Sequence, residues 1–270
     1  MPTWLIASAL FTTIGQCAIQ EPVLRQITPL ALLPDRAIRL KISGGNIQHS
    51  THLWLSCPTT VESLSLENES LASFPWNSSS VLREGYIAAR LFGSDGASGI
   101  QWLLVDSLPT VTLTNSLERF SPFHLFFGSA VESSFVELKS AWYRLHLPEG
   151  RRIYLETLAS RLGSSADPWI RWFDPNTGKI LGFQEDASGK SGDVLAEFPS
   201  GPAREVEIEL RDSAYGGGST FAYRLRVSDL PWQGDGRWAH SGSMFSGSSD
   251  DSPPSGREVE PNADPTRATP

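Results

Sequence analysis

The sequence has no apolar run long enough to cross a membrane. Its longest uncharged apolar stretch, from Trp4 to Ile14, is shorter than the roughly 20 residues that a spanning helix needs. Small residues follow it at Gly15 and Ala18, which is typical of a secretory signal peptide, although no Lys or Arg precedes it. We therefore predict a signal peptide over residues 1–18 and an exported chain that is secreted, periplasmic or cell-surface, with no transmembrane segment.

Cysteine is equally scarce, with only Cys17 and Cys57 present. Removal of the signal peptide would take Cys17 with it, so no internal disulfide could form and the core must supply the stability. We expect Cys57, in the segment LWLSCPTT, to be a small buried hydrophobe rather than a nucleophile.

Positive charge is in deficit. The chain carries 22 Lys and Arg against 30 Asp and Glu, which gives a net charge of −8. An acidic protein repels phosphate backbones and anionic membrane surfaces, so nucleic acid is not an expected partner.

Catalytic motifs are also missing. The sequence has no Gly-x-Ser-x-Gly elbow, and His49 and His52 stand three residues apart without the Glu of the zinc-protease helix motif. The glycines at 216–218 lead into an alternating strand pattern rather than a helix, so we predict a connecting loop and not a phosphate cradle. We assign no catalytic residues and expect a protein that is not an enzyme.

What the sequence does contain is strand after strand. The segments AIRLKIS, WYRLHLP, EVEIELRD and AYRLRVS alternate apolar and polar residues; in the third, Val206, Ile208 and Leu210 fall on one face. This period of two is typical of half-buried strands with one wet face. No long amphipathic helix is evident, and Gly- or Pro-containing turns recur about every ten residues, which favours β-sandwiches.

The organisation along the chain follows from composition. We predict a β-sandwich over 27–107, a linker over 108–121 and a second β-sandwich over 122–229. The tail at 233–270 is rich in Gly, Ser, Pro and Asp and has too few apolar residues to form a core, so we expect it to be disordered.

Two segments carry a family resemblance. LASRLGSSADPWIRWFDPNTGKIL (158–181) and EIELRDSAYGGGSTFAYRLRVS (207–228) resemble the bacterial pre-peptidase C-terminal (PPC) domain, a jelly-roll β-sandwich. Residues 27–107 resemble the immunoglobulin-like IPT/TIG module that often precedes it. EVEPNADP (258–265) resembles the opening of another such domain, which leaves two alternatives, a module cut short or a tail of turn-forming residues.

The resemblance and the local chemistry indicate two sets of candidate site residues. Glu185, Asp186 and Asp193 are candidate calcium ligands, because similar domains often carry acidic residues there and carboxylates suit calcium; the alternative is a solvated loop. Trp169, Trp172 and Phe173 are candidate ligand-binding aromatics, with Trp169 and Phe173 on one strand face and Trp172 on the other. Their alternative role is to fill the core.

The function implied by the resemblance is that of an exported, non-catalytic accessory module that binds extracellular protein or carbohydrate polymers. Two alternatives stay open: the truncated N-terminal part of a secreted hydrolase, and a structural spacer at the cell surface. The sequence leaves the oligomeric state open.

Overall fold

The all-β prediction is confirmed by the structure, a computed structural model that describes residues 21–34, 36–57, 64–68, 70–76, 82–113 and 118–233. Apart from strands, these residues form two short 3-10 helices, η1 (Ile47–His49) and η2 (Ser160–Leu162). No helix within these ranges is long and apolar enough to cross a membrane. The predicted signal peptide (1–18) and the predicted disordered tail, apart from Gln233, lie outside the described residues.

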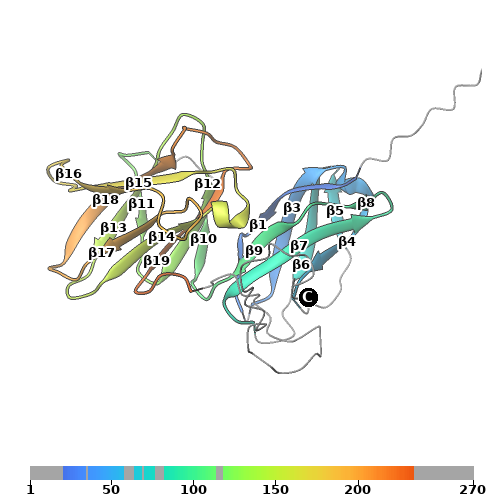
Figure 1. The fold of residues 1–270 in the computed structure, drawn as a ribbon, viewed down its shortest axis with the longest axis horizontal. Coiled ribbons are helices and arrows are strands. Elements are labelled where there is room, and N and C mark those ends of the chain that lie inside the picture. Colours follow the sequence, from blue (N-terminus) through green and yellow to red (C-terminus); the bar gives the residue numbers. More distant parts are fainter. Residues whose placement is uncertain are drawn as a thin grey trace, which may run out of the picture. The chain divides into compact units, whose positions relative to one another are not determined.

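The strands form four sheets that pair into two sandwiches, both within one compact unit (Figure 1). In the first sandwich, one sheet has the order β1 (Val23–Thr28), β3 (Ile38–Gly45), β6 (Leu71–Trp76), β5 (Ser65–Asn68). The facing sheet has the order β2 (Ala31–Leu32), β9 (Gln101–Val105), β7 (Gly85–Gly93), β4 (Ser50–Leu55), with β8 (Gly96–Ala97) paired to β7. We call these the β1 sheet and the β2 sheet.

The second sandwich has five strands in each layer. The β10 sheet has the order β10 (Thr110–Thr112), β12 (Ser129–Ser134), β19 (Ala222–Ser228), β14 (Ile153–Leu158), β17 (Leu195–Phe198). The β11 sheet has the order β11 (Phe123–Leu125), β13 (Ala141–Leu147), β18 (Arg204–Asp212), β15 (Pro168–Phe173), β16 (Ile180–Gln184).

Alternation along β18 places its apolar side chains in the core of the second sandwich, as predicted. Val206, Ile208 and Leu210 are each 0% exposed. They pack with inward side chains of the facing sheet, such as Leu155 and Leu225. Burial of such residues supplies the main driving force for folding, at about 25 cal/mol for each Å² of apolar surface removed from water.

The predicted linker at 108–121 differs from expectation. Its residues Thr110–Thr112 form β10, which pairs in parallel with β12 so that Thr110 lies opposite Ala130. Ala130 in turn lies opposite Arg226 on β19, the last strand of the second sandwich. The backbone amides and carbonyls of this segment are therefore used by the β10 sheet, because pairing with β12 satisfies groups that a free linker would leave to water.

Beside β10, a buried group of charged residues joins the two sandwiches. Asp106 follows β9 of the first sandwich and is 0% exposed; its Oδ2 lies 2.6 Å from Arg224 Nη2 and 2.9 Å from Arg226 Nε, both on β19. Glu132 on β12 lies 2.8 Å from Arg224 Nη1 and also accepts hydrogen bonds from the backbone amides of Leu30 and Ala31. We call Asp106, Glu132, Arg224 and Arg226 the junction cluster.

The junction cluster keeps the Asp106 carboxyl ionised and lies among apolar contacts between the two sandwiches. Burial raises the pKa of the Asp106 carboxyl, but the nearby Arg224 and Arg226 outweigh burial, and the net pKa lies below its ordinary value. Around the cluster, apolar side chains complete the contact between the sandwiches: Leu30, Ala31 and Leu104 pack with Leu158, Leu162 and Trp232. The ring of Trp232 also meets Tyr86 edge-on, at 4.9 Å between centroids.

Candidate functional site

The outer face of the β11 sheet carries an unusual mixture of carboxylates, guanidinium groups and aromatic rings. Antiparallel pairing places Glu209 of β18 between Trp142 of β13 and Arg171 of β15. Two residues earlier on the same face of β18, Glu207 lies between Arg144 of β13 and Phe173 of β15. The central strand thus supplies acidic side chains, and its neighbours supply basic and aromatic ones.

The two carboxylates lie beneath this layer rather than in water. Glu207 and Glu209 are 8% and 6% exposed, although the strand pattern predicts a wet face there. Arg171 reaches Glu209 Oε2 through Nε at 3.0 Å and Nη2 at 2.7 Å, and the Ser140 hydroxyl donates to Oε1 at 2.8 Å. Arg144 Nη2 lies 2.8 Å from Glu207 Oε1. Charge-assisted hydrogen bonds of this kind compensate the burial of the carboxylates and hold the guanidinium groups in place.

Above the carboxylates, guanidinium groups and rings alternate in a continuous series. Arg211 lies over Tyr215 and over Trp169, at 4.2 Å from each centroid. Arg171 lies over Trp169 at 5.1 Å and over Phe173 at 5.0 Å, and Arg119 lies over Phe173 at 5.1 Å and over Trp142 at 4.8 Å. We call this series the cation–aromatic row; its members, in order, are Tyr215, Arg211, Trp169, Arg171, Phe173, Arg119 and Trp142.

The row is ordered by a glycine-rich loop at one end. Asp212, at the end of β18, accepts hydrogen bonds from the backbone amides of Asp167, Ala214 and Gly216. A Cβ at Gly217 would collide with the backbone of Glu137, so only glycine allows the loop to approach the segment between β12 and β13. This confirms that the triple glycine connects β18 and β19, and the loop it forms carries Tyr215 to the end of the row.

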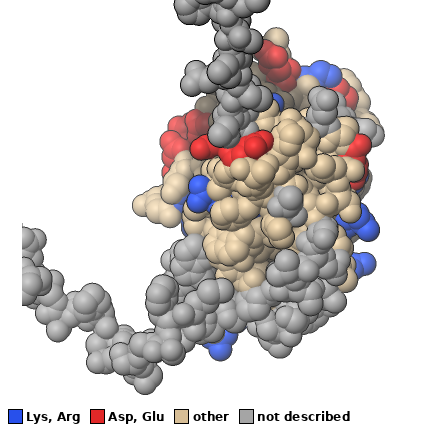
Figure 2. All heavy atoms as spheres, turned by 90° about the vertical axis from the view of Figure 1, so that its right-hand side faces the viewer, with Lys and Arg blue, Asp and Glu red and all other residues tan. Residues whose placement is uncertain are grey.

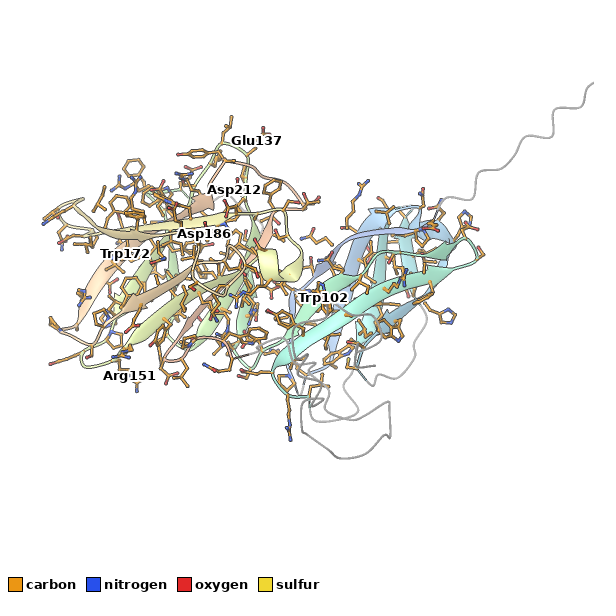
Figure 3. All side chains as sticks on the ribbon, in the orientation of Figure 1. Trp102, Glu137, Arg151, Trp172, Asp186 and Asp212 are labelled. Atoms are coloured by element: carbon orange, nitrogen blue, oxygen red, sulfur yellow. The ribbon has the colours of Figure 1, made fainter. Side chains whose placement is uncertain are left out.

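The three predicted ligand-binding aromatics fall on two different sides of β15. Trp169 and Phe173 belong to the cation–aromatic row. Trp172 points into the sandwich, where its ring meets Phe198 edge-on at 5.3 Å and lies directly against Gly182 (Figure 3). Phe173 is only 5% exposed, because Arg119 and Arg171 cover it.

The three predicted calcium ligands differ in exposure, and one of them is already paired with an arginine. Glu185 and Asp186 are exposed, just after β16, whereas Asp193 is 0% exposed. The carboxylate of Asp193 accepts hydrogen bonds from the amides of Ala159 and Ser160, each at 2.9 Å, and pairs with Arg161 Nε at 2.7 Å. Within the described ranges, no group of three or more His, Cys, Asp and Glu side chains is placed to hold a metal ion.

Arg161 links Asp193 to a second buried acid. Its Nη2 lies 2.9 Å from Glu156, which is 0% exposed, and Lys190 Nζ lies 3.3 Å from the same oxygen. Desolvation lowers the pKa of Arg161, but its pairing with Asp193 and Glu156 outweighs this and raises the net pKa above the ordinary value. Asp193 therefore stabilises the turn around η2 through its contacts with Ala159, Ser160 and Arg161.

Cys57 is buried, as predicted. It is 4% exposed, and burial raises the pKa of its thiol to about 11. Since the thiolate is the reactive species, a thiol that keeps its proton at neutral pH is a poor nucleophile.

The sequence nominated Trp169 and Phe173 but missed the other members of the row. Arg211, Trp142 and Tyr215 lie in segments that the sequence marked as strands or loop, with nothing local to connect them. Arg119 lies within the predicted linker. The only available signal was the presence of Trp or Arg at outward positions of three separate strands.

Comparison with known proteins does not identify a family: no protein-family model matches the chain, and no curated protein matches it. Among solved structures, the PPC domain of a collagenase from Bacillus anthracis aligns with 45% of this chain and 99% of its own, at 13% identity and a TM-score of 0.29. PliG of Aeromonas hydrophila, a periplasmic inhibitor of g-type lysozyme, aligns with 44% of this chain and 97% of its own, at 11% identity and a TM-score of 0.25.

A third similar structure is SGBP-B of Bacteroides ovatus, in complex with a mixed-linkage heptasaccharide. It aligns with 71% of this chain and 53% of its own, at 9% identity and a TM-score of 0.26. These values are too low to carry an argument about function, so the PPC and IPT/TIG assignments stay predictions.

Proposed function

We propose that this chain is an exported, non-catalytic binding module whose partner is an extracellular protein. The partner docks on the outer face of the β11 sheet, over the cation–aromatic row. The observation that carries the proposal is the row itself, in which three guanidinium groups are fixed between four aromatic rings above buried carboxylates.

The composition of the row favours a protein partner. Trp, Tyr and Arg are the residues most enriched among those that dominate the binding energy of protein interfaces. Guanidinium groups in fixed positions lose little conformational entropy on binding, and their remaining N–H groups can donate to carboxylates and carbonyls of a partner. Arg119 and Arg171 keep 43% and 35% of their side-chain surface exposed, so both remain accessible.

The same geometry argues against a neutral sugar polymer on this face. A sugar ring stacks on a bare aromatic face, whereas guanidinium groups already lie over Trp169 and Phe173 at 4.2–5.1 Å from their centroids. To stack on Trp169, a sugar would have to displace Arg171 together with its hydrogen bonds to the buried Glu209, or Arg211 together with its hydrogen bonds to the carbonyls of Asp212 and Ser213.

Peptide and glycan arrays probed with the full chain test this proposal. We expect binding to peptides and not to neutral glycans, and we expect Trp169→Ala to weaken the peptide binding by about tenfold or more, as for a central interface residue. The matched control is Arg152→Ala, which removes an arginine paired with Glu197 on the β10-sheet side of the sandwich. Unchanged melting temperatures would show that both variants fold.

Three outcomes would contradict the proposal. Binding to neutral glycans and not to peptides would assign the face to carbohydrate. Absence of binding on both arrays would favour the structural spacer. Peptide binding that Arg152→Ala weakens as much as Trp169→Ala does would place the partner elsewhere.

A further inference from the structure

A second surface, formed by the first sandwich and bordered by β10, combines a groove with unpaired positive charge. The groove has a volume of about 760 Å³ and lies over the outer side of the β1 sheet, close to β10. Its lining includes the exposed side chains of Arg36, Arg39 and Lys41. We call it the basic groove.

The charges of the groove follow from alternation along β3. Leu40 and Ile42 point into the core and are 0% exposed, so Arg39 and Lys41 must point outward. Pairing with β1 places Thr28 opposite Lys41. Two cations on one strand thus share a face, and Arg36 adds a third just before the strand begins.

Nothing in the described lining neutralises these cations. No Asp or Glu is among the described residues that border the groove. Within the same part of the chain, Arg36, Arg39 and Lys41 form no ion pair, and Arg39 makes one hydrogen bond, from Nη1 to the Ser73 hydroxyl at 3.2 Å. On the face of the first sandwich shown in Figure 2, by contrast, the Lys and Arg residues drawn in colour stand apart from one another.

Such a grouping is unexpected in a chain with a net charge of −8. Charges further away than the Debye length, about 8 Å at physiological ionic strength, are largely screened, so an anion in the groove responds chiefly to its three cations. The groove therefore attracts anions even though the protein as a whole repels them.

The remaining lining indicates which kind of anion fits. Gln26, Thr28, Ser43 and Thr112 border the groove and can both donate and accept hydrogen bonds. These groups match the hydroxyls of a sugar, whereas no aromatic side chain lies among the described lining residues to stack on a nucleobase. A volume of about 760 Å³ is within the usual range for a small-ligand site and suits a short segment of a polymer.

From these features we infer that the basic groove binds a segment of an acidic polysaccharide, one that carries carboxylate or sulfate groups. This site is separate from the cation–aromatic row and independent of the protein partner proposed above. Arg39 and Lys41 pair with the acidic groups, and the surrounding hydroxyls and amide bind the sugar hydroxyls.

Titration calorimetry of the full chain tests the inference with four probes: polygalacturonate for carboxylate, dextran sulfate for sulfate, unmodified dextran, and single-stranded DNA. We expect binding to at least one acidic polysaccharide and not to dextran or DNA, and we expect it to weaken as NaCl rises. Arg39→Glu combined with Lys41→Glu should weaken binding by about a hundredfold, since each of the two charge-assisted contacts contributes about tenfold.

Arg83→Glu is the matched control, because Arg83 is an exposed cation of the same sandwich outside the groove lining. It should bind as the parent does, and so should Trp169→Ala, which distinguishes failure here from failure of the proposed function. The inference is overturned by absence of binding to both acidic polymers, by equal binding to dextran or DNA, or by equal losses in Arg83→Glu and the double variant. Melting temperatures check that each variant is folded.

Discussion

Replacement of Arg224 by methionine tests the junction cluster most directly. Arg224 is 0% exposed and lies 2.6 Å from Asp106 and 2.8 Å from Glu132, which are 0% and 2% exposed. Methionine keeps most of the length and apolar volume of the side chain but removes its charge. Asp106 would retain Arg226, whereas Glu132 would keep only the backbone amides of Leu30 and Ala31 as hydrogen-bond donors.

The expected loss in the free energy of unfolding is about 3–5 kcal/mol, the usual cost of removing one partner from a buried ion pair. That is a large fraction of the roughly 5–15 kcal/mol by which folded domains are stable. Because the cluster joins the two sandwiches, Arg224→Met should also separate their unfolding, giving a broader transition or two transitions in urea.

Urea denaturation followed by tryptophan fluorescence and by far-UV circular dichroism measures both effects. Lys139→Met is the control, since it removes an exposed ion pair with Glu118 and should cost less than about 1 kcal/mol. Adding Glu132→Gln to Arg224→Met should recover part of the loss, because the amide keeps an acceptor oxygen and carries no charge. A loss below about 1 kcal/mol for Arg224→Met, or no recovery in the double variant, would refute this account of the junction.

Three further predictions concern other parts of the molecule. Gly217→Ala should lower the free energy of unfolding by about 1–3 kcal/mol in urea denaturation, because its Cβ would collide with the backbone of Glu137. Gly99→Ala, which has open space around it, should be nearly neutral, and equal effects of the two variants would contradict the packing of the loop. Cys57 should resist alkylation in the folded protein at pH 8, and rapid labelling of the Cys57 peptide, detected by mass spectrometry, would contradict its protonation. The stability that the protonated thiol contributes should be intact below pH 9.0 and be lost as the pH rises towards about 11. Millimolar calcium should leave the melting temperature unchanged, because an arginine already pairs with Asp193; a clear rise would show that calcium competes for that carboxylate.

The period of two in the sequence predicted the core side of the strands well, because inward burial is decided by the chain's own pleat. Val206, Ile208 and Leu210 are all fully buried. The same pattern predicted a wet face for Glu207 and Glu209, and that part was wrong. A second layer of side chains from neighbouring strands covers them, and a local pattern contains no information about what lies above a strand.

The strand β19 shows the same limit more strongly. Its segment AYRLRVS alternates like a surface strand, yet every residue from Ala222 to Ser228 is buried. Arg224 and Arg226 face the other sandwich, and their acidic partner Asp106 is more than 100 residues away in the chain. Such a partnership depends on how two separately folded layers meet, which periodicity cannot show.

The candidate site was predictable in part for a related reason. The alternation in PWIRWF correctly separated Trp169 and Phe173 from Trp172, because all three lie on one strand. The groups that make the site chemically distinctive, Arg119 and Arg211, come from a different segment and a different strand. Their contacts depend on strand order and register, which are properties of the whole sheet.

The position of β10 has a mechanical consequence for the second sandwich. The chain enters β10 and leaves β19 on the same side of the β10 sheet, because these two strands run in opposite directions and Thr110, Ala130 and Arg226 are aligned across three neighbouring strands. Two strand spacings, about 10 Å, separate the first and last of these residues. Tension applied between the two flanking segments would therefore be borne locally, beside the junction cluster, and would not pass through the β11 sheet.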